Sequence, residues 1–467
     1  MQYVSTRGAA PALGFADALL AGLARDGGLY APLSVPRFPA EAIRGLRGVP
    51  YAQAAARVMA PFVEPDFSPA EIESLSRAAY AGFGRAAAAP IAQLDDNLFV
   101  LELFHGATLA FKDFAMQFLG RAMNRILRER GERATIVGAT SGDTGAAAIE
   151  AFAGQSEVEI FILYPQGRVS DVQRRQMTTV DRPNVHALAI QGSFDDCQRI
   201  VKDLFGDLAF RDDLRLTGVN SINWARIAAQ IVYYFVGAVA LGAPERPVSF
   251  AVPTGNFGDV LAGYYAKRMG LPVERLIVAT NENDILARAL ASGLYAPRGV
   301  KATQSPSMDI QVSSNFERLL FEASGRDSET VVALMGELTG NGSFTIPPPA
   351  LKRIRADFDG VRVDEAACAE EMGRVYRESG MIVDPHSAVG IAAARGALAK
   401  APATPVIALA TAHPAKFPDA VERATGVRPP LPERLRDLME RKEKIAVLPN
   451  DRRAVADFVR QTARAAA

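Results

Sequence analysis

Short runs of continuous apolar residues, many of them β-branched, alternate with longer Ala-rich amphipathic segments from residue 98 onward. Such runs are typical of parallel strands buried on both faces, and the segments between them are typical of crossover helices. Seven strands are predicted: Leu98–Leu103, Ala134–Gly138, Val158–Tyr164, Val185–Ile190, Val248–Val252, Arg275–Thr280 and Val406–Ala410. The pattern therefore predicts an α/β fold with mostly parallel sheets covered by helices.

The two ends of the chain follow a different pattern. Residues 40–57 and 69–85 are Ala-rich with intermittent charge, and Ser68 followed by Pro69 is a typical helix start. We therefore expect a mainly helical N-terminal domain over residues 1–95. From Pro432 to Lys444 mixed charges recur at helical spacing, which predicts a helical C-terminal extension over 431–467.

Composition narrows the possible partners and cofactors. The 467 residues carry 52 basic and 52 acidic side chains, a balance that argues against nucleic acid as the main partner. The length is that of about three domains. The two cysteines are far apart and the four histidines show no paired spacing, so neither a disulfide scaffold nor a metal site is expected.

One segment has the composition of a short membrane span. Residues 227–243 carry no charge, but the stretch is at the short limit for a bilayer and is followed at once by Pro244-Glu-Arg-Pro247. A helix that is apolar all round is equally typical of a large protein's interior, and we expect that here. The first residues lack the apolar region of a signal peptide, so a cytoplasmic protein with no membrane role is predicted.

Ligands of open α/β sheets bind where strands lead into helices, and two such turns are rich in glycine. One carries Thr140-Ser141-Gly142-Asp143-Thr144-Gly145, and the other Gly255-Asn256-Phe257-Gly258. Glycine lets the backbone approach a ligand, and the free amides of a helix N-terminus favour an anion. A capped turn without a ligand is the alternative for both. Asp259 would repel a phosphate in the second turn, so it must point away if that turn binds one.

Two further turns carry lysines. Lys112 lies between Phe111 and Phe114 at a predicted helix start, where the helix dipole and apolar neighbours both lower a lysine's pKa. A neutral amine can form an imine, whereas a lysine paired with Asp113 would be structural. After the last predicted strand, Thr411, His413 and Lys416 follow in one turn.

Together these motifs resemble the threonine synthases, a family of pyridoxal-phosphate enzymes of the tryptophan-synthase-β fold type, and in particular their bacterial and fungal branch. The resemblance runs through nearly the whole chain. One departure is Ala107, where family members usually carry Pro. The motifs are Tyr3-Val-Ser-Thr-Arg-Gly8, Asp26-Gly-Gly-Leu-Tyr30, His105-Gly-Ala-Thr-Leu-Ala-Phe-Lys-Asp113, the turn at 140–145, Ser221-Ile-Asn-Trp-Ala-Arg226, Pro253-Thr-Gly-Asn-Phe-Gly-Asp259 and Thr411-Ala-His-Pro-Ala-Lys-Phe417.

The resemblance implies a fold of two open, mostly parallel sheets. It also implies a large cofactor-binding domain over 96–133 and 191–430. Because the turn at Ser141 lies in a separate strand–helix block, we expect residues 134–190 to form a small mobile substrate domain. A monomer or a homodimer is expected.

The resemblance also assigns roles to residues. Lys112 would hold pyridoxal 5'-phosphate as a Schiff base and serve as acid and base, and Thr411 would bind the pyridine nitrogen. The cofactor phosphate would bind to the amides of Gly255, Asn256, Phe257 and Gly258. The substrate carboxylate and the cofactor's phenolic oxygen would meet Thr140, Ser141, Asp143 and Thr144. Many relatives in the wider fold have Asn at the position of Asp143, and an anionic carboxylate cannot donate to the phenolate.

The activity implied is conversion of O-phospho-L-homoserine and water to L-threonine and phosphate, by γ-elimination and β-addition of water. The substrate phosphate then needs its own cationic pocket, for which the candidates are Asn223, Arg226, Lys416 and Arg168. A serine or threonine dehydratase would share Lys112 and the phosphate loop without requiring that pocket. A threonine-synthase-like protein that binds the cofactor without activity is the other alternative.

Overall fold

The larger of the two main sheets is parallel except at one edge. The computed structural model describes residues 1–463. In these residues the sheet has the strand order β13-β10-β9-β14-β4-β3, and only β3 is antiparallel to its neighbour. Along β9, Phe250 and Val252 join one hydrophobic cluster and Ala251 joins another, because successive side chains of a strand face opposite sides. The strands are β3 (Ile91–Asp95), β4 (Leu98–Glu102), β9 (Val248–Pro253), β10 (Val273–Thr280), β13 (Phe358–Arg362) and β14 (Val406–Ala410).

Helices cover both faces of this sheet, as continuous apolar strands require. One face packs against α10 (Trp224–Ala240) and α11 (Gly258–Arg268), and the other against α16 (Glu365–Ser379) and α17 (Pro385–Leu398). The remaining helices of this part are α12 (Ile285–Ser292), α13 (Phe316–Ala323), α14 (Ser328–Asn341), α15 (Pro348–Asp357) and α18 (Pro418–Thr425), with the short strand pair β11 (Leu294–Tyr295) and β12 (Phe344–Thr345).

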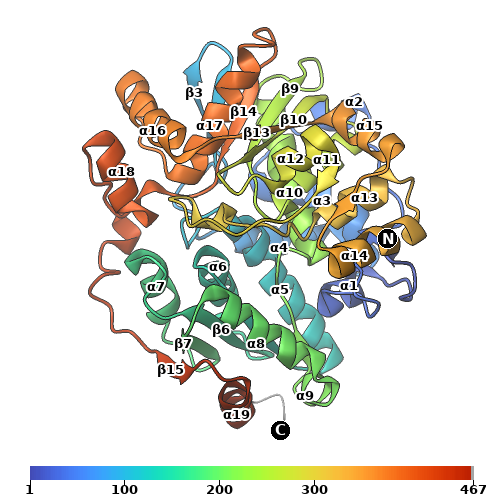
Figure 1. Ribbon diagram of the computed structural model, residues 1–467, viewed down its shortest axis with the longest axis vertical. Helices are drawn as coiled ribbons and strands as arrows, with labels where there is room; N and C mark the ends of the chain where they lie inside the picture. The colour runs from blue at the N-terminus through green and yellow to red at the C-terminus, as the bar shows by residue number, and fades with distance from the viewer. Residues whose placement is uncertain (464–467) are drawn as a thin grey trace.

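The second sheet is parallel throughout, with the order β15-β7-β6-β5-β8. In β5, Ile136 faces the cluster that contains α5 and α6, whereas Val137 faces α8, α9 and α19. Figure 1 shows this sheet with α6, α7 and α8 below the larger one, and α5 running from the centre of the molecule down beside the second sheet. The elements are β5 (Ala134–Ala139), β6 (Val158–Pro165), β7 (Val185–Gln191), β8 (Leu216–Thr217), β15 (Ala446–Pro449), α5 (Lys112–Arg130), α6 (Asp143–Phe152), α7 (Asp171–Thr178), α8 (Phe194–Gly206), α9 (Leu208–Asp213) and α19 (Arg452–Thr462).

The seven predicted strands are all present, as β4, β5, β6, β7, β9, β10 and β14, and the α/β fold with two mostly parallel sheets is confirmed. Residues 1–95 contain four helices, but also the strand pair β1–β2 and the edge strand β3 of the larger sheet. These N-terminal elements are β1 (Tyr3–Ser5), β2 (Tyr30–Pro32), α1 (Phe15–Ala21), α2 (Ala40–Arg44), α3 (Tyr51–Val63) and α4 (Pro69–Tyr80).

The second sheet extends beyond the predicted range 134–190, because β8 and β15 form its two edges. β15 comes from the C-terminal extension, which runs from α18 down the side of the molecule to the second sheet (Figure 1). Residues 464–467 of that extension lie outside the described residues.

The helix predicted from Pro432 to Lys444 is wrong. Only a single 3₁₀ turn, Glu433–Leu435, forms there. The rest of the stretch bonds to α7 instead: Arg175 donates to the carbonyl of Arg441 at 3.0 Å, and the amide of Lys444 donates to the carbonyl of Thr178 at 2.7 Å. Tertiary contacts at α7 thus outweigh the helical charge spacing.

The uncharged stretch at 227–243 forms most of α10, whose residues from Trp224 to Phe235 are all buried. It packs between the larger sheet and α5, as expected of a helix that is apolar all round. Among the described residues, no helix combines the length and hydropathy of a membrane span.

Close packing between α5 and α6 depends on Gly120. A Cβ atom there would lie 2.7 Å from the carbonyl oxygen of Ala151 in α6. By contrast, Gly336 in α14 is exposed and has open space around it. Since α5 begins with Lys112, this contact sets how the helix approaches the second sheet.

We expect Gly120→Ala to destabilise the protein by about 1–3 kcal/mol, because α5 must shift away from α6. Gly336→Ala is the matched control and should be neutral or stabilising by up to about 1 kcal/mol, since alanine favours an exposed helix. Thermal and denaturant unfolding followed by circular dichroism measure both. Equal stability of Gly120→Ala and the parent would contradict the packing argument.

Candidate active site

Lys112 begins α5 in a turn that is tied to the end of β14. The amide of Phe111 donates to the carbonyl of Thr411 at 2.9 Å, and the amide of His413 donates to the carbonyl of Leu109 at 3.0 Å. These bonds bring the predicted lysine and the predicted hydroxyl residue together. Lys112 is 8% exposed, and its Nζ lies 4.8 Å from the centre of the Phe111 ring.

The partner of Lys112 is Asp143 rather than Asp113. Its Nζ lies 3.4 Å from Oδ2 of Asp143, the first residue of α6. Asp113 accepts bonds from the amide and hydroxyl of Thr108 at 2.8 and 2.7 Å, and burial raises its pKa to about 6. The structural pairing considered for Lys112 and Asp113 is therefore not formed.

The pKa of the Lys112 amine is lowered from its ordinary value. Burial is the main cause, and Asp143 works against it by favouring the charged amine. The charges of Lys416 and Arg226 lower the pKa further. A lysine whose neutral form is favoured in this way is suited to nucleophilic attack on a carbonyl carbon.

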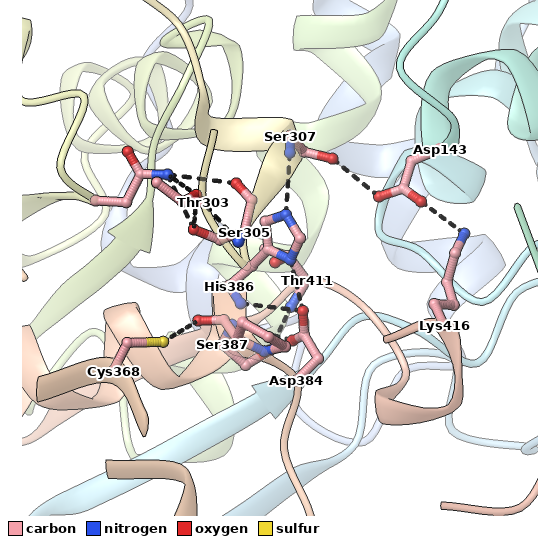
Figure 2. A network of polar contacts seen from close by, with 12 residues as sticks. Asp143, Thr303, Ser305, Ser307, Cys368, Asp384, His386, Ser387, Thr411 and Lys416 are labelled. Carbon is pink, nitrogen blue, oxygen red and sulfur yellow. Dashed lines mark hydrogen bonds and ion pairs between the residues drawn. The ribbon is translucent and has the colours of Figure 1, made fainter. Parts of the chain in front are cut away.

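Asp143 is buried and accepts from four side chains. Lys416 and Gln173 each lie 2.8 Å from its Oδ1, and Ser307 donates at 3.1 Å to Oδ2, the oxygen that Lys112 also contacts. Figure 2 shows the contacts of Lys416 and Ser307 with Asp143. Burial alone would raise its pKa, but Lys416 and Lys112 lower it well below the ordinary value. The side chain is a carboxylate that accepts bonds and donates none.

The turn between β9 and α11 forms the predicted cradle. Phe257 has a left-handed backbone, with φ of 65°, and the carbonyls of Gly255 and Asn256 accept bonds from Ser313 and Asn315. Among the described residues, the amides at 255–258 have no hydrogen-bond acceptor. A Cβ on Gly255 would lie 2.8 Å from the carbonyl oxygen of Ser307. The turn thus has free donors and no room for a side chain at Gly255.

Asp259 points away from the cradle, as a phosphate site requires. Tyr233 and Tyr234 of α10 donate to its Oδ1 at 2.5 and 2.8 Å. Burial raises the pKa of Asp259 to about 6. The carboxyl group is thus held against α10, and the start of α11 keeps its positive dipole end facing the turn.

Thr411 follows β14 and is buried. Its amide donates to the hydroxyl of Ser387 at 3.1 Å, while its own hydroxyl has no partner among the residues that the structure describes. A free hydroxyl beside the Lys112 turn can bond to a ring nitrogen.

The candidates for a second anion site differ in how their polar atoms are used. Lys416 is fully buried and also donates to the carbonyl of Thr108 at 2.8 Å. Arg226 is buried, donates to the carbonyl of Val219 at 3.3 Å, and has no ion-pair partner within residues 1–463. Its Nε is without a hydrogen-bond partner, and burial lowers its pKa to about 10. A buried cation without a carboxylate is suited to binding an anion.

Asn223 and Arg168 are less suited to a buried anion site than Lys416 and Arg226. The side chain of Asn223 caps α10 by accepting from the amide of Ala225 at 3.1 Å, and it donates to the carbonyl of Leu19 at 2.9 Å. Arg168 is exposed and makes no ion pair in the described part of the chain.

In the turn after β5, the hydroxyl of Thr140 is already used. It accepts from the amides of Gly142 and Gly145 at 3.0 and 2.9 Å and so holds the turn. Ser141 and Thr144 are half-buried, and their hydroxyls have no partner within the described residues. These two hydroxyls are the ones left for a ligand.

Several contacts of the site escape sequence reasoning. Gln173 and Ser307, which bond to Asp143, belong to no motif and lie far from it in the chain. The helix start at Asp384 and Pro385 is visible in the sequence, but nothing there shows that His386 faces Ser307.

Three family models match the chain: Threonine synthase N terminus over residues 2–80, Pyridoxal-phosphate dependent enzyme over 86–412, and Threonine synthase, C-terminal over 387–459. A threonine synthase from Pseudomonas aeruginosa is 52% identical over 99% of this chain and 98% of that relative. A pyridoxal-phosphate-bound threonine synthase from Brucella melitensis, solved by X-ray crystallography, is 59% identical with a TM-score of 0.96, covering 99% and 100% of the two chains. The yeast threonine synthase structure is 39% identical with a TM-score of 0.94, covering 99% of this chain and 98% of that one.

The residues of this site fit pyridoxal phosphate. The cofactor needs an amine for its aldehyde, donors for its phosphate and a partner for its ring nitrogen. The site offers all three: the amine of Lys112, the free amides at 255–258 and the hydroxyl of Thr411. Because there is no room for a side chain at Gly255, only backbone atoms of that residue face the phosphate position.

We expect Gly255→Ala to weaken cofactor binding at least tenfold, because the methyl group must displace the backbone of Ser307. Gly258→Ala is the matched variant, since its nearest neighbour, Nδ2 of Asn315, would be 3.4 Å away. It should stay within about threefold of the parent. Cofactor dissociation constants come from absorbance after dialysis against a series of cofactor concentrations. Equal retention in both variants would place the phosphate elsewhere.

Proposed function

Since this chain belongs to the threonine synthase family, we propose that its substrate is O-phospho-L-homoserine, which reacts with water to give L-threonine and phosphate. Membership makes the protein a pyridoxal-phosphate-dependent lyase of threonine biosynthesis. The observation that carries the choice of substrate is the buried cation Arg226, which has no carboxylate partner among the described residues. A dehydratase acting on serine or threonine needs no such cation.

We propose that Lys112 holds the cofactor, that the amides of Gly255, Asn256, Phe257 and Gly258 bind its phosphate, and that Thr411 bonds to its ring nitrogen. Bound pyridoxal phosphate supplies an electron-withdrawing system that makes carbon-bound protons of an amino acid removable. A neutral hydroxyl partner such as Thr411 does not enforce a positive charge on that nitrogen, as a carboxylate partner would.

Lys112 is the proton carrier in this proposal. Its lowered pKa makes the unprotonated amine easier to form than in an ordinary lysine, and the unprotonated amine can accept a proton from the substrate and return it. Asp143 fixes the direction of the amine through the 3.4 Å contact and holds Lys416 on its other oxygen. Ser141 and Thr144 would bind the substrate carboxylate, together with the turn held by Thr140.

Arg226 and Lys416 are the proposed cations for the substrate phosphate. Their charges both act on Lys112, so they lie within electrostatic reach of the reacting centre. The side-chain amide of Asn223 is already hydrogen-bonded at its oxygen and at its nitrogen. A positioning role therefore suits Asn223 better, because its side chain fixes the start of α10, the helix that carries Arg226.

We further propose that the part carrying Asp143 and Ser141 closes on the larger sheet when substrate binds. The bonds of Asp143 to Lys112, Lys416 and Ser307 link α6 to the start of α5 and to two segments of the larger-sheet side. Closure would keep bulk water away until the addition step. The cytoplasmic location and the state as monomer or homodimer stay predictions.

Substrate choice is tested by two product assays on the purified holoenzyme. We expect phosphate release and threonine formation from O-phospho-L-homoserine, with keto-acid production from serine or threonine at least a hundredfold slower. Lys112→Ala should lower turnover at least a thousandfold and leave the far-ultraviolet circular dichroism unchanged. Borohydride reduction and peptide mapping should place the cofactor on Lys112. A label on Lys416, or keto acid as the main product, would overturn the proposal.

Arg226→Gln should raise KM for O-phospho-L-homoserine about 10- to 100-fold, the effect of losing one charge-assisted contact of about 1.5–3 kcal/mol. Cofactor affinity should change by no more than about threefold. Arg168→Gln, at an exposed arginine, is the parallel variant and should keep the parent KM. A KM effect only in Arg168→Gln would move the phosphate pocket to that side.

A further inference from the structure

The start of α17 carries a buried Asp–His pair that the proposed chemistry does not use. Asp384 is fully buried and caps the helix by accepting from the amides of His386 and Ser387 at 3.1 and 3.0 Å. Its Oδ2 also lies 2.6 Å from Nδ1 of His386. His386 is 2% exposed, and its ring packs against the ring of Phe417, with 4.9 Å between centres.

The contacts of His386 define one tautomer. The amide of Ser307 donates to Nε2 at 3.1 Å, and an amide can donate only to a ring nitrogen that carries no proton. The remaining ring proton is then on Nδ1, from which it is donated to Asp384. The ring is therefore neutral and bonded at both nitrogens, with Asp384 fixing which nitrogen accepts.

Ser307 connects this pair to the site. It lies in the 3₁₀ turn Pro306–Met308, and its hydroxyl donates to Oδ2 of Asp143 at 3.1 Å (Figure 2). Lys112 faces the same oxygen. Its carbonyl oxygen is the atom that a Cβ on Gly255 would meet. One residue thus touches both the carboxylate beside the reactive amine and the cradle.

The same aspartate also reaches the other end of the site. Ser387 donates its hydroxyl to Asp384 and accepts from the amide of Thr411. Two chains of hydrogen bonds therefore start at Asp384 (Figure 2). One runs through His386 and Ser307 to Asp143, and the other runs through Ser387 to Thr411.

We propose that Asp384 and His386 are positioning residues for the reaction. By accepting a hydrogen bond from the amide of Ser307, neutral His386 holds the Ser307 hydroxyl in its hydrogen bond to Asp143 and so fixes the direction of the Lys112 amine. This role rests on the proposed function, because it assigns His386 an effect on the proton transfer of Lys112. His386 itself touches neither Lys112 nor Asp143 through a hydrogen bond.

Two amide variants separate the two ring nitrogens. The side-chain amide of Gln reaches the place of Nε2 and can accept from Ser307, whereas that of Asn reaches only the place of Nδ1 and can bond only to Asp384. We expect His386→Gln to keep kcat within about threefold of the parent. His386→Asn should lower kcat at least tenfold, with KM and the cofactor dissociation constant changed by less than about threefold. Equal losses in the two variants would overturn the proposal.

Ser307→Ala provides the test of the path. It should lower kcat to a similar extent as His386→Asn. The kcat of the double variant should be no more than about twofold below that of the less active single variant, because both changes break the same path. Losses that multiply would show that His386 acts independently of Ser307. Circular dichroism and melting temperature confirm folding of each variant.

A measurement without substrate keeps this inference separate from the proposed function. Nitrogen NMR of the holoenzyme labelled at histidine, with the His386 signal identified by its loss in His386→Gln, should show the neutral tautomer protonated at Nδ1. A charged ring, or a ring protonated at Nε2, would overturn the inference even if threonine is made. If the tautomer is as expected but O-phospho-L-homoserine does not react, the proposed substrate fails while the His386–Ser307 contact stands.

Discussion

The site depends on one buried carboxylate, Asp143, held between two buried lysines. A carboxylate in such surroundings is costly unless cations and donors compensate it, and removing one partner of a buried ion pair costs about 3–5 kcal/mol. Lys112 begins α5, Lys416 follows β14, and Asp143 begins α6 on the second sheet. The need to compensate this one charge therefore ties three segments from distant parts of the sequence to a common point.

Backbone strain is found at the two turns that carry the chemistry. Leu109 and Phe257 have φ of 62° and 65°, a left-handed conformation that costs a non-glycine residue about 1–3 kcal/mol. Each is held by neighbours: His413 donates to the carbonyl of Leu109, and Asn315 bonds to the carbonyl just before Phe257. In these turns Lys112 is buried, and the cradle amides have no acceptor among the described residues. Packing elsewhere supplies the energy that keeps these turns in place.

Sequence patterns predict the parts of this fold that rest on local periodicity, and they miss the parts that rest on distant partners. The apolar strands such as β9 and the glycine turns that follow them are visible along the chain. β13 carries Asp359 and Arg362, so it lacks an apolar run and becomes a strand only by pairing with β10. That Asp259 must point away from a phosphate-binding turn follows from charge repulsion, but the tyrosines that hold it there are visible only in the structure. The pairing of Asp143 with Ser307 likewise joins residues that no spacing relates.

The carboxyl groups near the site differ in what they leave for a ligand. Asp113 and Asp259 are bonded to the hydroxyls of Thr108 and of two tyrosines, and burial raises both pKa values to about 6. Within residues 1–463, neither forms an ion pair with a lysine or arginine. Among the carboxyl groups of the site in the described part of the chain, only Asp143 forms such ion pairs. The charge of Arg226 lowers the pKa of Lys112. An anion bound beside Arg226 would offset that charge and raise the proton affinity of the Lys112 amine. Burial thus gives the site both its reactive lysine and its attraction for phosphate, and it couples the two.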